Sequence, residues 1–154
     1  MIPTLKKQGR GAVLLVHGKP FLMLAGEVYN SNASTVESME GVWQQAEALG
    51  LNTLLLPVAW EQLEPEEGRF DDSFWDRFLN VAKDCGMQVI FCTPTATPPA
   101  WLTEKYPEVL NCDIYGHPVY HGMRKHHNMT SPVYLDFVKK IVEHIAAHYS
   151  AHPA

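Results

Sequence analysis

Two short apolar runs, each followed by a polar loop and a helical pattern, constrain the fold of this chain most strongly. Residues 51–60 (LNTLLLPVAW) form one continuous apolar run, and residues 87–92 (MQVIFC) form another. Such runs are typical of strands buried on both faces of a parallel sheet. Amphipathic helix patterns cover residues 36–49 and 72–85. Because strands and helices alternate, the sequence predicts an α/β fold with a parallel sheet.

Capping signals define the helix ends. Ser34 or Thr35 is expected to cap the first helix. The clearest helix covers residues 132–149, with Ser131 as its N-cap and Pro132 at its first position. Its expected apolar face comprises Val133, Phe137, Ile141, Ile145 and Tyr149.

The N-terminal residues carry a different pattern, in which two apolar runs flank the tetrapeptide HGKP at 17–20. Gly18 tolerates positive φ and Pro20 fixes its own φ, so a turn is expected there. We predict a β-hairpin whose second run, Phe21–Ala25, enters the interior.

Two architectures fit the βα alternation, a doubly wound open sheet and a (β/α)8 barrel. The first βα loop, AGEVYNSNAS at 25–34, has one glycine and no GxGxxG phosphate-binding pattern, and GxxxxGK[ST] occurs nowhere. The loops after the strands are long and polar. A barrel brings such loops together at one shared site, which favours the barrel.

The loop residues suit a carbohydrate, because a sugar ring needs flat aromatic faces for its apolar side and polar groups for its hydroxyls. Trp60 and Trp101 fit equally well as packing residues. Glu64 fits equally well as a helix cap or as a partner of Arg69. The loop candidates are Glu27, Tyr29, Asn30, Asn32, Trp60, Glu61, Glu64, Thr93, Thr95, Thr97, Trp101, Arg124, His126, His127 and Asn128.

Charge and cysteine content exclude several functions. The net charge of −5 gives no electrostatic case for nucleic acid or an anionic membrane, and no stretch is long enough to span a bilayer. Cys85, Cys92 and Cys112 form no CxxC motif, which predicts reduced thiols in a cytoplasmic protein. The histidines at 121–127 form no HExxH motif, so we expect neither a metal nor another cofactor.

Five segments carry a family resemblance. Residues 50–79 resemble the second βα unit of retaining β-galactosidases with a barrel catalytic domain. Residues 93–110 (TPTATPPAWLTEKYPEVL), 124–134 and 148–154 are similar to glycoside hydrolase family 42 in particular. The stretch 21–34 (FLMLAGEVYNSNAS) is more similar to family 35, which shares a clan with family 42.

The resemblance implies a partial (β/α)8 TIM barrel of about the first three βα units, preceded by a β-hairpin. Residues 1–20 would be the N-terminal segment and hairpin strand, and residues 21–154 the N-terminal portion of the barrel domain. The implied reaction is retaining hydrolysis of terminal β-D-galactosides by two carboxylates about 5 Å apart. In the family both carboxylates follow later strands, so neither is expected on this chain.

The resemblance also implies contacts with the sugar. Arg124 corresponds to the arginine that binds the terminal galactose, and Trp60 and the loop from Glu27 through Tyr29 to Asn30 would lie near it. Trp101 belongs to the loop at 92–102, which resembles one wall of the sugar site. Glu27, Glu61 and Glu64 match no catalytic motif. Asn128 stands where some members have a zinc-binding cysteine, which argues further against zinc.

The resemblance allows two kinds of partner for this chain and one alternative function. A partial barrel exposes sheet edges, so it is expected to self-associate or to bind the missing part of the barrel. The alternative to an enzyme is a non-catalytic carbohydrate-binding or self-assembling fragment.

Overall fold

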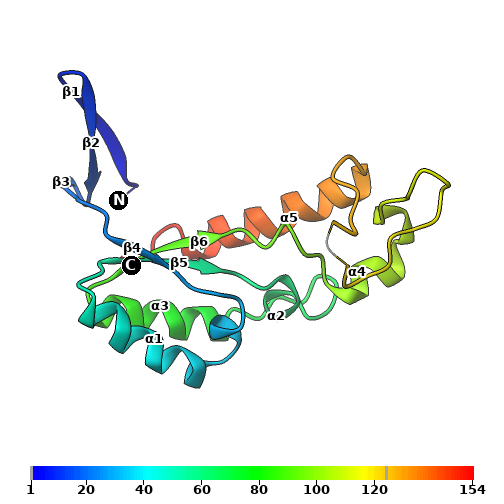
Figure 1. Cartoon of the computed structure of the whole chain (residues 1–154), viewed down its shortest axis with the longest axis horizontal. Helices are drawn as coiled ribbons and strands as arrows, with labels where there is room; N and C mark the ends of the chain where they lie inside the picture. The colour runs from blue at the N-terminus through cyan, green and yellow to red at the C-terminus, as the bar shows by residue number, and fades with distance from the viewer. Residues whose placement is uncertain (1, 124) are drawn as a thin grey trace.

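The computed structural model describes residues 2–123 and 125–154, and a three-stranded parallel sheet lies at its centre (Figure 1). Its strands are β4 (Ala25–Glu27), β5 (Thr53–Pro57) and β6 (Gln88–Cys92), in the order β4-β5-β6. Strands that are consecutive in this series are therefore neighbours in space. This arrangement confirms the predicted parallel α/β organisation.

A helix follows each of these strands: α1 (Val36–Ala48), α3 (Ser73–Asp84) and α5 (Pro132–Tyr149). The capping predictions are confirmed for two of them. The Thr35 hydroxyl accepts a hydrogen bond from the backbone N–H of Ser38 at 3.1 Å, so Thr35 rather than Ser34 caps α1. None of the described helices is both long and apolar enough to cross a membrane.

The helix α5 begins as its sequence predicts. Its N-cap is Ser131, whose hydroxyl accepts a hydrogen bond from the Tyr134 N–H, and Pro132 is its first residue. Because Pro132 has no N–H to leave unpaired, it suits the first turn. The expected apolar face is buried at Phe137 and Ile141, and Tyr134 is buried as well.

One face of the sheet carries the core. Side chains alternate along a strand, so Leu54 and Leu56 point to the same face, and both are fully buried. Trp75 of α3 and Ile141 of α5 are also fully buried in this core. On the opposite face, Ile90 of β6 is 38% exposed. The helices therefore cover one face of the sheet and leave the other partly open.

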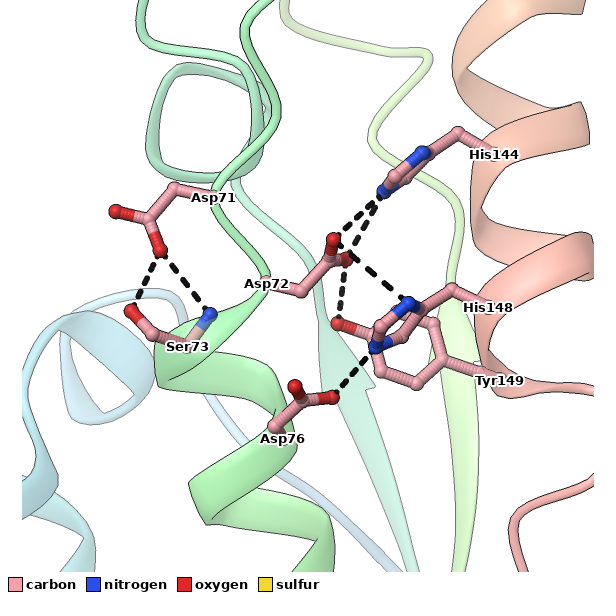
Figure 2. Close-up of polar contacts among 7 residues, drawn as sticks. All are labelled: Asp71, Asp72, Ser73, Asp76, His144, His148 and Tyr149. Carbon is pink, nitrogen blue, oxygen red and sulfur yellow. Dashed lines mark hydrogen bonds and ion pairs between the residues drawn. The ribbon is translucent and has the colours of Figure 1, made fainter.

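A polar cluster joins the start of α3 to the end of α5 (Figure 2). The Nε2 atom of His144 lies 3.0 Å from both carboxylate oxygens of Asp72, and the Tyr149 hydroxyl donates to Asp72 Oδ1 at 2.9 Å. The Nε2 atom of His148 lies 2.8 Å from Asp76 Oδ1. These contacts fix the direction of α5 relative to α3.

The N-terminal residues form a separate antiparallel sheet of β1 (Thr4–Gln8), β2 (Gly11–Val16) and β3 (Lys19–Pro20), which projects from the body in Figure 1. The expected turn at HGKP is confirmed, since Val16 pairs with Lys19. The pairing of β1 with β2 was not predicted.

The prediction that Phe21–Ala25 enters the interior is wrong. Leu22 is 78% exposed, and Leu24 is 48% exposed. The side chain of Asn52 accepts from the Leu24 N–H at 2.9 Å and donates to the Leu22 carbonyl at 2.8 Å. These bonds hold the segment as a connection to the sheet, whose first strand begins only at Ala25.

Short helical turns occupy the connections after the strands. They are η1 (Asn32–Ser34), α2 (Trp60–Leu63), α4 (Ala100–Lys105) and η2 (Pro107–Val109). Each lies beyond the carboxyl end of a strand of the parallel sheet, where ligands bind in α/β proteins.

Candidate functional site

A cavity of about 540 Å³ lies at the carboxyl ends of the three parallel strands. This volume is within the range of small-molecule sites. Residues after β4, β5 and β6 all contribute to it, so the predicted convergence of the loops is found in the structure. Its lining comprises Asn30, Ala33, Ser34, Pro57, Val58, Ala59, Trp60, Glu61, Gln62, Cys92, Thr93, Pro94, Ala96, Thr97, Pro98, Pro99 and His121.

Trp60 belongs to both the core and the cavity wall. Its side chain is 1% exposed, and its ring centroid lies 6.2 Å from that of Tyr134. The indole N–H donates to Glu64 Oε2 at 2.8 Å. The packing interpretation of this tryptophan is therefore confirmed, and the residue also belongs to the cavity lining.

Glu64 is buried and accepts hydrogen bonds from two segments. Besides the Trp60 indole, the backbone N–H of Gly68 donates to its Oε1 atom at 2.8 Å. The Glu64 carbonyl accepts from the Trp101 indole at 2.8 Å. The suggestion that Glu64 pairs with Arg69 is wrong, because the Arg69 guanidinium instead binds Glu66 at 3.0 Å.

Three other predicted sugar contacts, Glu27, Tyr29 and Trp101, are not among the residues that line the cavity. Glu27 is on the exposed part of β4, and Tyr29 is 77% exposed. Trp101 is half-buried and packs edge-on against Phe137, with ring centroids 5.5 Å apart. Arg124 lies outside the described residues.

Gln62 and His121 are polar lining residues that sequence reasoning missed. Gln62 donates from its side-chain amide to the Ser34 carbonyl at 3.1 Å, which ties the loop after β5 to the loop after β4. His121 contacts Thr103 through Nδ1 at 3.1 Å. The position of Gln62, two residues after Trp60 in a strand-end loop, was the one available signal; His121 gave none beyond its membership of a histidine-rich segment.

The acidic residues around the cavity differ in surroundings. Glu61 is exposed and lines the cavity. Glu67 is held at the surface by Lys105 at 3.0 Å and by the Tyr106 hydroxyl at 2.8 Å. Hydrogen bonds from Lys105 and then Tyr106 lower the pKa of Glu67. Glu61 is therefore the carboxylate with access to a ligand in this cavity.

The histidines after α4 pack with one another and with aromatic residues. His126 donates from Nδ1 to the Met123 carbonyl at 2.6 Å, and the His127 ring centroid lies 4.7 Å from that of Tyr134. Within residues 2–123 and 125–154, no three His, Cys, Asp or Glu side chains are grouped as metal ligands. Burial, and then the neighbouring His126, lower the pKa of His127.

His127 is expected to make stability depend on pH. Because its folded-state pKa is below the usual value of about 6.5, the unfolded chain binds more protons between the two values. Its contribution is therefore present above about pH 6.5 and lost as pH falls. Urea unfolding at pH 7.5 and pH 5.5 provides the test. Between these two pH values, His127→Phe should lose less unfolding free energy than the wild type. The exposed histidine variant His17→Asn is the control, and equal losses in the wild type and His127→Phe would contradict the expectation.

Comparison with known proteins gives the family. The model of the β-galactosidase family, glycoside hydrolase family 42, matches residues 28–154. A β-galactosidase of Bifidobacterium bifidum is 36% identical over 105 residues, which are 68% of this chain and 15% of that protein. A β-galactosidase of Geobacillus kaustophilus is 31% identical over 137 residues, which are 86% of this chain and 20% of that protein. The chain thus spans a fifth or less of these relatives.

The fold agrees with that family. A catalytic mutant of a family 42 β-galactosidase from G. stearothermophilus superimposes with a TM-score of 0.77 and 32% identity, covering 86% of this chain and 20% of that one. The match of the family model covers most of the chain, including every strand-end loop that lines the cavity. The chain belongs to glycoside hydrolase family 42, the β-galactosidase family.

Proposed function

We propose that this chain is the N-terminal portion of a β-galactosidase catalytic barrel and supplies about three of its eight βα units. Residues 21–154 would form the barrel portion, and residues 1–20 the N-terminal segment with its hairpin strand. The parallel order of β4, β5 and β6 supports this proposal. It is also supported by coverage, because the chain spans only 15–20% of the length of these two relatives.

The proposed reaction of the whole protein is retaining hydrolysis of terminal β-D-galactosides. Its support is family membership, since the relatives are β-galactosidases. We assign no catalytic carboxylate on this chain. Glu64 binds protein groups through both oxygens, whereas Glu27 and Glu61 are exposed but match no catalytic motif.

The proposed role of the loops after β4, β5 and β6 is to form one wall of the galactose subsite. The convergence of three strand-end loops on one cavity carries this proposal. Trp60 and Asn30 line that cavity. The sugar contacts proposed from the motifs alone are Glu27, Tyr29, Trp101 and Arg124.

The second candidate function is a non-catalytic, self-assembling partial barrel that binds carbohydrate. The described part of the sheet supports it, because β4 and β6 each pair only with β5 there and Ile90 is exposed on the open face. Light scattering separates monomer from oligomer.

The three free cysteines support the prediction of a cytoplasmic protein.

Calorimetric titration with isopropyl β-D-thiogalactoside, which glycosidases do not hydrolyse, tests the sugar site. We expect binding of this ligand and none of the matching thioglucoside at the same concentration. Turnover of a nitrophenyl β-galactoside in the same sample separates the enzyme from the binding fragment. Equal heats for the two thioglycosides would contradict the proposal.

A further inference from the structure

We propose that Glu64 is a positioning residue, whose carboxylate holds the Trp60 indole in the orientation that forms the cavity wall. This inference rests on the proposed sugar-binding function of the cavity. Glu64 is 4% exposed and lies just after α2. It does not line the cavity and so acts through the residue that does.

The two oxygens of the carboxylate bind two fixed donors. Oε2 accepts from the Trp60 indole and Oε1 from the Gly68 backbone N–H, each at 2.8 Å. Hydrogen bonds to an ionised acceptor are shorter and stronger than bonds between neutral groups. Because one donor belongs to the backbone, the carboxylate cannot rotate without losing a bond. The orientation of the indole is thereby tied to the backbone of the loop after β5.

The backbone of Glu64 extends this control to the next βα unit. Its carbonyl accepts from the Trp101 indole in α4. Pro98 and Pro99, which directly precede α4, line the cavity. One residue therefore connects the cavity walls that come from the loops after β5 and β6.

Replacing Glu64 by glutamine distinguishes a positioning role from a role in packing alone. Glutamine has nearly the volume of glutamate, but it has one oxygen acceptor and an NH₂ donor. In Glu64→Gln one of the two N–H groups, from Trp60 or Gly68, would face another donor. A buried donor without an acceptor is costly, so the side chain would rotate and release the indole. A residue needed only for volume would tolerate this exchange.

The test uses the whole chain with its tryptophan indoles labelled with ¹⁵N. The Trp60 resonance is assigned by its absence in Trp60→Phe. In the wild type, this resonance is expected to move when isopropyl β-D-thiogalactoside is added. In Glu64→Gln, it should be displaced before ligand is added, and the affinity should fall about tenfold. Glu66→Gln removes an exposed carboxylate of the same loop and is expected to change neither.

An unmoved Trp60 resonance in Glu64→Gln, or an affinity within about twofold of the wild type, would overturn the inference. If the wild type binds no thiogalactoside, the proposed function fails. The position of the Trp60 resonance in Glu64→Gln then decides whether Glu64 orients the indole: displacement supports this and an unmoved resonance overturns it.

A second variant covers the case in which Glu64→Gln does not fold. Trp101→Phe removes the donor to the Glu64 carbonyl and leaves the carboxylate intact. It is expected to displace the Trp60 resonance before any ligand is added. An unmoved Trp60 resonance in Trp101→Phe would overturn the inference.

Discussion

Trp60→Ala is expected to lower the free energy of unfolding by about 3–5 kcal/mol, as truncation of a buried aromatic residue does. The side chain is 1% exposed, so its removal leaves a void between α2 and Tyr134 of α5. It also leaves Glu64 Oε2 without its indole donor. The same change removes part of the cavity wall, so thiogalactoside binding should be lost. Urea unfolding followed by circular dichroism measures the first effect, and calorimetry at a temperature where the variant is folded measures the second.

Trp43→Ala is the matched control for the loss of a tryptophan. Trp43 is half-buried on α1, packs against Phe78 at 4.7 Å between centroids, and does not line the cavity. It should lower stability while leaving thiogalactoside affinity unchanged. A loss of less than about 1 kcal/mol in Trp60→Ala, or ligand binding equal to that of the wild type, would show that Trp60 neither supports the core nor forms the cavity wall.

Asp72→Ala is expected to lower the free energy of unfolding by about 1–3 kcal/mol, the cost of leaving buried hydrogen-bonding groups without a partner. Asp72 accepts from the Tyr149 hydroxyl and contacts His144, and its side chain is only 16% exposed. Asp136→Ala is the control. Asp136 forms an exposed ion pair with Lys140, for which less than about 1 kcal/mol is expected. Equal losses in the two variants would show that the α3–α5 cluster does not stabilise the fold.

The same cluster is expected to make the free energy of unfolding depend on pH in the alkaline range. Burial, and then the hydrogen bond to Asp72, raise the pKa of Tyr149. A folded-state pKa above the usual value of about 10 means that the protonated phenol is favoured in the fold. Its contribution is present below about pH 10 and is lost as pH rises through the folded-state value. Tyr149→Phe, which removes the titrating phenol, should therefore lose less unfolding free energy than the wild type between pH 9 and pH 11 in urea unfolding.

Local signals predicted the helices α1, α3 and α5 and the strands β5 and β6 well, but they placed the run before β4 too early in the chain. The caps Thr35 and Ser131 act within one helical turn, so their residue types carry the information. The hairpin of β1 and β2 carried no such signal. All of β1 is exposed, so no alternation of buried and exposed residues marks Thr4–Gln8 as a strand.

The candidate site was predictable only in outline. That the loops after three parallel strands meet follows from topology, and Trp60 and Asn30 do line the shared cavity. The role of Glu64 was not predictable. Its bond with Trp101 joins residues 37 positions apart, and no local pattern reports such a contact. Tertiary packing also decided that Trp101 binds the Glu64 carbonyl rather than lining the cavity.

A crystal structure of the chain with bound galactose would test the central claim most directly. We expect one galactose in the cavity at the carboxyl ends of β4, β5 and β6, in contact with Trp60 and Asn30. Galactose bound only elsewhere on the chain, or a cavity that holds only solvent in crystals soaked at a saturating concentration, would contradict it.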